Sequence, residues 1–193
     1  MEKGIVNTKF DLIVIGGSAG SLDALLHILP MLESPPAPVI IVLHRKYSND
    51  TTLSDLFSTR TRLKVKEVED KDPLKKGRIY IAPADYHLLI EKEKTFTLDD
   101  SEKINYSRPS IDVTFQSAAD VFGEKLACIL LSGANADGTE GFEYVQSLGG
   151  ITIAQDPGSA EVPFMPRHAI KSGFASHTMG LKEISGFING NSL

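Results

Sequence analysis

A serine set between glycines near the start of the chain is the first feature that could do chemistry. The segment 10–26 reads FDLIVIGGSAGSLDALL: an apolar run, two glycines, Ser18, and then apolar residues at helical spacing. Small neighbours let a serine sit on a tight strand-to-helix turn with its hydroxyl exposed, as in the pattern Gly-x-Ser-x-Gly. The following helix would aim free backbone N–H groups at the same spot, which suits a developing oxyanion. The other interpretation is that Ser18 or Ser21 only caps that helix.

The same glycine turn is a poor match to the known nucleotide-binding loops. A dinucleotide fingerprint needs three glycines, but counting from Gly16 the second and third places hold Ser18 and Ser21. The acidic residue expected after the next strand is also missing, because the segment 44–46 reads His-Arg-Lys. No Gly-Lys-Ser/Thr follows Gly16, which disfavours a P-loop. The sequence therefore predicts no nucleotide cofactor.

A nucleophilic serine needs a base, and His44 is the best candidate for it. Of the five histidines, His44 alone directly follows a predicted central strand, at the end where open α/β sheets place their sites. Taken alone, His44 could equally be an ordinary loop residue. We interpret the other four as surface or structural histidines: His27 in the first helix, His87 in a hairpin region, His168 in a late helix and His177 in a loop.

The base in turn needs an orienting carboxylate, and Asp137 stands after another apolar run, in ACILLSGANADGTEG. Asp-Gly is also turn chemistry, so Asp137 could simply cap the next helix. What favours catalysis is the conjunction, since Ser18, His44 and Asp137 each follow a separate strand of one predicted sheet. We expect these three side chains to meet at one rim of the fold.

Short apolar runs that alternate with helix-period segments predict the scaffold. The pattern is typical of an α/β fold with a doubly wound, mostly parallel sheet and helices on both faces. The predicted strands are 12–15, 39–43, 63–68, 126–131 and 151–154. Helices are expected after the first strand, over 111–122, and from about residue 139 to Gly149-Gly150.

Finer features of these elements follow from spacing. Ser110 is placed to cap the helix 111–122. The first helix is expected to bury Leu22, Leu25, Leu26 and Leu29. The segment 77–100 offers three strand-like pieces without a helix between them, which predicts appended antiparallel hairpins.

Composition limits the class of protein. With 193 residues and 41% hydrophobic content, residues 1–193 are expected to form one domain. The net charge of −5 leaves no basic stripe, so no nucleic-acid partner is expected. The apolar run 12–15 is too short for a signal peptide or membrane span, which predicts a cytoplasmic protein without membrane insertion. The lone Cys128 excludes an internal disulfide and cysteine-based zinc motifs, and it is interpreted as a small buried thiol.

Beyond these patterns, the sequence resembles the chemotaxis-receptor methylesterases, the CheB-type catalytic domain. The resemblance runs over nearly the whole chain and rests on VIGGSAGSLDAL, IVLHRKYS, GRIYIAPADYHLLI, RPSIDVTFQSAADVFG, LLSGANADGTEG and AQDPGSAEVPFMPRHAI. The last segment is long and specific.

The resemblance implies a Ser-His-Asp triad formed by Ser18, His44 and Asp137, with no metal or cofactor. Members hydrolyse γ-glutamyl methyl esters in the cytoplasmic helical region of methyl-accepting chemotaxis receptors and release methanol. Some also deamidate glutamine there. Well-known members carry an N-terminal receiver domain, whereas this chain begins about ten residues before its first predicted strand. We therefore expect residues 1–193 to be a single catalytic domain without a receiver, either because the protein acts without that regulator or because the receiver was trimmed away.

Departures from the family pattern leave a second function open. Ser132–Asn135 stand where the family usually reads Thr-Gly-Met-Gly, and Arg45-Lys46 where it usually reads Met-Pro. These changes bear on the substrate more than on the reaction type. The alternative is a catalytically altered member that acts as a receptor-binding or signalling scaffold.

Two later segments carry further candidate residues. Met165 and Arg167 are candidates for lining the cleft, while Pro166 is interpreted as a helix-start residue. Gln155-Asp156 are either supports of the site or plain loop residues.

Overall fold

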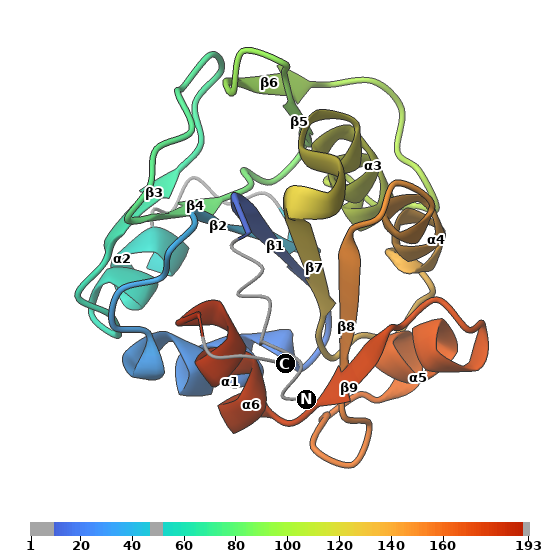
Figure 1. Ribbon diagram of the computed structural model, residues 1–193. Coiled ribbons are helices and arrows are strands. Elements are labelled where there is room, and N and C mark those ends of the chain that lie inside the picture. Colours follow the sequence, from blue (N-terminus) through green and yellow to red (C-terminus); the bar gives the residue numbers. More distant parts are fainter. Residues whose placement is uncertain (1–9, 47–51, 191–193) are drawn as a thin grey trace, which may run out of the picture.

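Seven parallel strands form the central sheet of the computed structural model, which describes residues 10–46 and 52–190 (Figure 1). The strand order is β3-β4-β2-β1-β7-β8-β9. The strands are β1 (Leu12–Gly17), β2 (Val39–Leu43), β3 (Lys64–Glu67), β4 (Arg78–Ile81), β7 (Leu126–Leu130), β8 (Ile151–Gln155) and β9 (His177–Met179). Because β1, β2 and β7 are covered on both faces, they consist of consecutive buried apolar residues and glycines, as predicted.

Helices cover both faces of this sheet, which confirms the doubly wound fold (Figure 1). One face carries α1 (Ser21–Ile28), α2 (Thr52–Ser58) and α6 (Leu181–Ile188), and the other carries α3 (Ile111–Phe122), α4 (Thr139–Ser147) and α5 (Phe164–Lys171). Short 3-10 turns follow α1 (Leu29–Met31) and α3 (Gly123–Lys125). Alternate strand residues feed the two cores: Leu12 and Val14 face α3 and α4, while Ile13 and Ile15 face α1 and α6.

Two of the three strand-like pieces in the segment 77–100 form the predicted hairpin. Strands β5 (His87–Ile90) and β6 (Phe96–Asp99) form an antiparallel pair that packs on α3. The first piece is instead β4, which pairs parallel with both β2 and β3 in the main sheet. The misassignment has a physical reason: β3 and β4 are joined by a loop, not by the crossover helix that usually marks a parallel connection in sequence.

Two further expectations were wrong in detail. Leu22 is 40% exposed, because α1 starts at Ser21 and turns Ala24, Leu25 and Ile28 toward the sheet instead. His177 was expected in a loop, but it begins β9, a three-residue strand at one edge of the sheet.

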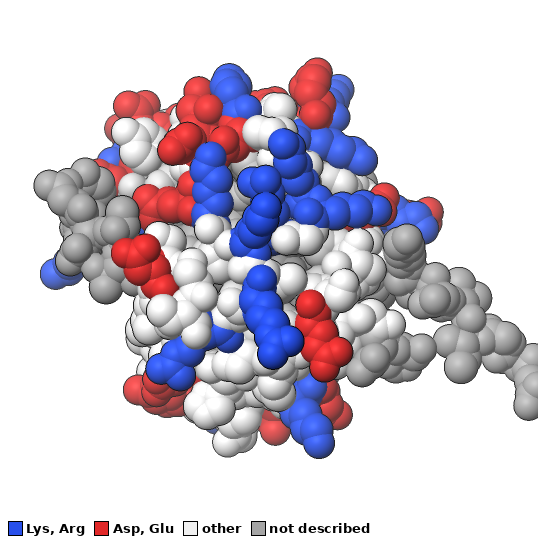
Figure 2. Space-filling model, turned by 90° about the vertical axis from the view of Figure 1, so that its left-hand side faces the viewer, with Lys and Arg blue, Asp and Glu red and all other residues white. Residues whose placement is uncertain are grey.

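The strand at the opposite edge of the sheet, β3, carries charged side chains that disfavour pairing with another chain. It carries Lys64 and Lys66, and Figure 2 shows lysine and arginine side chains gathered on the side of the molecule where β3 lies in Figure 1. Cationic side chains on an edge strand oppose pairing with a second chain.

The order of the strands places a topological switch at the centre. From β1 the chain builds outward through β2 and on to the β3–β4 pair, and then returns to the other side of β1 as β7, β8 and β9. The loops after β1 and β7 therefore diverge, and such a point is where open α/β sheets bind their ligands. No helix within residues 10–46 and 52–190 is long and apolar enough to cross a bilayer.

The aromatic contact between two helices gives the first testable prediction. Phe115 of α3 stacks on Phe142 of α4 with ring centroids 5.6 Å apart, and both side chains are fully buried. Phe115→Ala should lower the free energy of unfolding by about 3–5 kcal/mol, because it leaves a cavity between sheet and helices. Urea denaturation measures this, with the half-exposed Leu22→Ala as control, expected to lose less than about 1 kcal/mol. Equal losses in the two variants would contradict this view of the core.

Candidate active site

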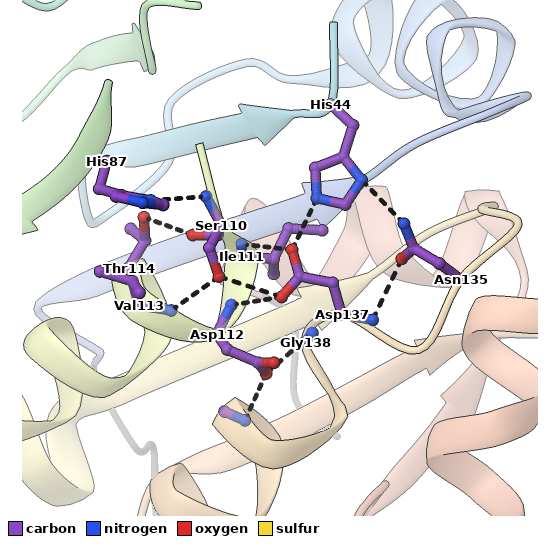
Figure 3. Close-up of polar contacts among 11 residues, drawn as sticks. His44, His87, Ser110, Ile111, Asp112, Val113, Thr114, Asn135, Asp137 and Gly138 are labelled. Carbon is purple, nitrogen blue, oxygen red and sulfur yellow. Dashed lines mark hydrogen bonds and ion pairs between the residues drawn. The ribbon is translucent and has the colours of Figure 1, made fainter. Parts of the chain in front are cut away.

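His44 and Asp137 meet at the carboxyl edge of the sheet, as predicted from their positions after separate strands. The ring Nε2 of His44 lies 2.6 Å from Asp137 Oδ2 (Figure 3). The side chain of Asp137 is fully buried and that of His44 is 11% exposed. The backbone N–H of His44 donates to the carbonyl of Gly17 at 3.1 Å, which ties the end of β2 to the end of β1.

The N-terminus of α3 holds the Asp137 carboxylate. Oδ2 accepts from the backbone N–H of Ile111 at 2.7 Å, and Oδ1 accepts from that of Asp112 at 3.0 Å and from the Ser110 hydroxyl at 3.2 Å (Figure 3). These N–H groups are the unpaired donors of a helix start, where a negative charge is favoured. Burial alone would raise the pKa of Asp137, but the hydrogen bonds from His44, Asp112 and Ile111 hold it below its ordinary value. Asp137 is therefore ionised near neutral pH, and it does not cap α4, whose N-cap is Gly138.

The ionised carboxylate fixes the tautomer of His44. A carboxylate only accepts, so the proton of the neutral ring is on Nε2 and the lone pair is on Nδ1. Nδ1 faces the side-chain amide of Asn135, with Nδ2 at 3.4 Å (Figure 3). The Asn135 Oδ1 accepts from the backbone N–H of Asp137 at 3.1 Å. Asn135 thus contacts the base nitrogen and steadies the loop that carries the acid.

Ser18 directly follows β1, next to the end of β2. Its backbone N–H donates to Ser132 O at 2.9 Å and its side chain is half-buried. Neither Ser18 nor Ser21 caps α1, because the N-cap is Gly20 and the Ser21 hydroxyl donates back to the Ser18 carbonyl. The Ser18 hydroxyl makes no hydrogen bond to any residue in the described ranges, and none joins it to the His44 ring. The structure therefore pairs His44 with Asp137, while Ser18 is tied to the site through its neighbour Gly17, whose carbonyl accepts from the His44 N–H.

Glycines allow this turn to form. Gly20 has φ +77°, and a Cβ at Gly16 would lie 2.5 Å from Ile111 Cγ2, so Gly16 lets the start of α3 approach β1. The Ser132 hydroxyl donates to the Ala19 carbonyl at 2.8 Å and fixes the turn from the β7 side. The backbone N–H groups of Ala19 and Gly20 have no acceptor within the described part of the chain. They are free donors one and two residues after the serine.

Comparison with known proteins identifies the family. The CheB methylesterase family model matches residues 13–188. This chain belongs to the CheB methylesterase family. A relative named putative protein-glutamate methylesterase/protein-glutamine glutaminase, from Leptospira interrogans, is 41% identical over 178 residues, which cover 92% of each chain.

A solved structure in the family shares the fold. The crystal structure of the Thermotoga maritima CheB methylesterase catalytic domain superposes with a TM-score of 0.89 at 34% identity, covering 94% of this chain and 98% of that one. The curated protein-glutamate methylesterase/protein-glutamine glutaminase of the same organism is 36% identical over 172 residues. This chain spans 50% of the length of that relative.

A buried histidine supports the site from the hairpin. His87 of β5 accepts the Ser110 N–H on Nδ1 at 3.1 Å, and its Nε2–H donates to the Glu102 carbonyl at 2.9 Å (Figure 3). The chain His87–Ser110–Asp137–His44 thus links the hairpin to the site of this CheB-family protein. The expectation of a structural histidine is confirmed for His87, which is 1% exposed.

Among the described residues, the other histidines form no hydrogen bond with His44 or Asp137. His27 bonds to a backbone carbonyl of its own helix, His168 pairs with the Thr139 hydroxyl, and His177 lies in the edge strand.

Residues after β8 support the loop that follows β7. Gln155 Oε1 accepts from the Ser132 N–H at 3.0 Å, so Gln155 is a support, whereas Asp156 is exposed in a turn. Met165 is fully buried under Gly133 and does not line an open cleft, contrary to one expectation. Arg167 is exposed on α5.

Asp112 is a functional neighbour that the sequence patterns missed. Its Oδ1 accepts from the backbone N–H groups of Gly138 at 2.8 Å and Gly141 at 2.6 Å, which fastens the start of α4 to the start of α3. Burial, with the nearby negative charge of Asp137, raises the pKa of Asp112 to about 7. The sequence did carry a signal for this role. Asp112 stands three positions before Phe115 and seven before Ala119, so it lies on the apolar side of the predicted helix, where a carboxylate is unexpected.

The raised pKa of Asp112 predicts a pH dependence of stability. Between its ordinary pKa of 3.8 and about 7, the folded chain keeps a proton that the unfolded chain has lost, so stability declines as pH rises through this window. Asp112→Asn keeps an acceptor oxygen but cannot ionise. From pH 5 to pH 8, the wild type should therefore lose on the order of 2 kcal/mol of unfolding free energy relative to this variant.

Urea denaturation at the two pH values measures the difference. Asp23→Asn, at an exposed position in the first turn of α1, makes the same charge change and should track the wild type. If Asp112→Asn also tracked the wild type, Asp112 would not titrate in this window.

Proposed function

We propose that this protein is a serine hydrolase that removes methyl groups from γ-glutamyl methyl esters of methyl-accepting chemotaxis receptors. The observation that carries the proposal is the 2.6 Å contact between His44 Nε2 and Asp137 Oδ2, at the strand end beside Ser18. An imidazole oriented by a buried carboxylate is the base that a serine nucleophile requires.

In the first half-reaction His44 acts through Nδ1. The Ser18 hydroxyl rotates toward Nδ1, takes the place of the Asn135 amide, and gives its proton to that nitrogen as Oγ attacks the ester carbonyl. Asp137 stabilises the imidazolium that forms, while its helix-bound carboxylate stays ionised. This assignment exchanges the two ring nitrogens relative to the familiar triad, in which Nδ1 faces the aspartate.

The free N–H groups of the turn stabilise the tetrahedral intermediate. Ala19 and Gly20 follow the nucleophile directly, and their N–H groups are available to the developing oxyanion. Because Ser132 holds the Ala19 carbonyl, these donors are fixed before the substrate arrives.

Collapse of the intermediate breaks the ester C–O bond, and His44 returns the proton to the leaving methoxide, which departs as methanol. Water then attacks the acyl-enzyme with His44 as base, and release of Ser18 leaves the glutamate carboxylate. A primary amide in place of the ester would release ammonia by the same steps. Glutamine deamidation is therefore part of the proposal, in line with the double name printed for the relatives.

We infer the substrate, and the compartment in which the protein acts, from its family. Receptor methylation sites lie on helices in the cytoplasm, so we place this protein there as a partner of the receptors. Neither a metal nor a cofactor enters the steps above.

The rival function is a receptor-binding or signalling scaffold. Asn135 favours it, because its amide faces the nitrogen that Ser18 must reach, at 3.4 Å. A scaffold of this kind would keep the fold and lack an activated serine. Reaction with a fluorophosphonate therefore separates the two functions.

The enzyme proposal predicts rapid fluorophosphonate labelling at Ser18 alone, located by peptide mass mapping. Ser18→Ala should lower the esterase rate by about 10⁴ to 10⁶ without loss of stability, because the hydroxyl has no partner to lose within the described residues. Ser147→Ala, at the far end of α4, is the matched control and should be fully active. An unlabelled wild type would favour the scaffold.

Methanol release from methylated receptors tests the substrate. Purified receptor with radiolabelled methyl groups should lose label to volatile methanol with the wild type and not with Ser18→Ala. If Ser18 reacts with the fluorophosphonate but no methanol appears, the enzyme acts on a different ester.

A further inference from the structure

A hollow beside His44 is not used by the mechanism above. Its volume is about 540 Å³, and His44 is the one residue that it shares with the proposed triad. It is lined by His44, Arg45, Lys46, Asp85, Lys103, Tyr106, Ser107 and Arg108. The lining comes from the loop after β2, from the turn between β4 and β5, and from the segment that leads into α3.

Ion pairs and hydrogen bonds hold the two arginines of the hollow in place. Arg45 forms an ion pair with Glu67 of β3. Arg108 pairs with Asp85 at 2.9 Å and donates to the carbonyls of Asp100 and Ser101 at 2.7 and 2.8 Å. The Nε atom of each guanidinium is buried and has no hydrogen-bond partner within the described residues.

The two lysines of the hollow are available to a ligand. Lys46 and Lys103 are exposed, and neither has an ion-pair or hydrogen-bond partner within residues 10–46 and 52–190. Among the described residues, four cationic side chains and a single carboxylate, that of Asp85, therefore line the hollow. Its charge is opposite to the net charge of −5 of the whole chain.

A second hollow, on the other side of the serine turn, is acidic where the first is basic. Its lining includes Gly20, Asp23, His27 and Glu161, and none of the described residues that line it is a lysine or an arginine. An anionic group of a bound substrate is thus attracted on the His44 side of Ser18 and repelled on the Gly20 side.

From this asymmetry we infer that the hollow binds a side-chain carboxylate of the substrate segment that carries the ester. Lys46 and Lys103 contact the carboxylate, and the paired arginines form the fixed wall behind it. The inference rests on the proposed function, because a polypeptide with glutamyl esters supplies such groups as neighbouring unmodified glutamates. It adds a rule of specificity: the enzyme selects esters flanked by acid and fixes the direction in which the segment lies.

Two synthetic peptides test the rule. Each contains one γ-methyl glutamate, and they differ only in whether the flanking residues are glutamate or glutamine. The wild type should cleave the acidic peptide with a kcat/KM about tenfold higher, the size expected of two exposed charge pairs. At about 0.5 M NaCl the preference should shrink severalfold, because salt screens exposed charges.

The double variant Lys46→Ala/Lys103→Ala should bring the ratio of the two kcat/KM values close to one. The matched control Lys171→Ala/Lys182→Ala removes two exposed lysines from α5 and α6 and should keep the wild-type ratio. A wild type without preference, or a double variant that retains it, would overturn the inference.

Binding to an inactive enzyme separates this inference from the proposed function. With Ser18→Ala as background, fluorescence anisotropy should give a Kd for the acidic peptide about tenfold below that for the neutral one, and Lys46→Ala/Lys103→Ala should remove the difference. This result is independent of turnover, so it supports the carboxylate site even if neither peptide is hydrolysed. Equal Kd values for the two peptides would refute the site, whatever the esterase activity.

Discussion

The burial of the Asp137 carboxylate over the first turn of α3 is the constraint on which the rest of the site depends. An ionised group without solvent is costly unless donors replace the lost water. Here Ile111, Asp112 and Ser110 provide them, so α3 must start at this point and at this distance from the sheet. Gly16 makes the approach sterically possible. The orientation of His44 is then a consequence, since Asp137 accepts the one ring proton.

The sequence allowed much of this to be predicted, because the relevant physics is local. Apolar runs predicted the central strands, Ser110 predicted the start of α3, and strand-end positions predicted the pairing of His44 with Asp137. Each of these depends on residues close together in the chain or on a general property of parallel sheets. The position of Ser18 on its turn was predicted in the same way, but no pattern fixes the rotation of a hydroxyl, and its bond to His44 stays a prediction.

What could not be predicted depends on contacts between distant segments. Placing β4 inside the main sheet required knowing that a loop, without a helix, joins it to β3. The part played by His87 depends on a hairpin folding over α3, and that of Asp112 on two helices starting side by side. Asn135 was noted only as a departure from a family pattern, whereas in space it contacts the base.

The division of the sheet into two halves has a consequence for the geometry of the site. Strands β1 to β4 form one contiguous half and β7 to β9 the other, so among the described residues the β1–β7 pairing is the only strand pairing between the halves. Ser18 and His44 belong to the first half and Asp137 to the second. Loss of the β1–β7 register would separate the Asp137 carboxylate from the His44 ring. The contact between base and acid therefore depends on the register of β1 on β7, two strands that carry neither residue.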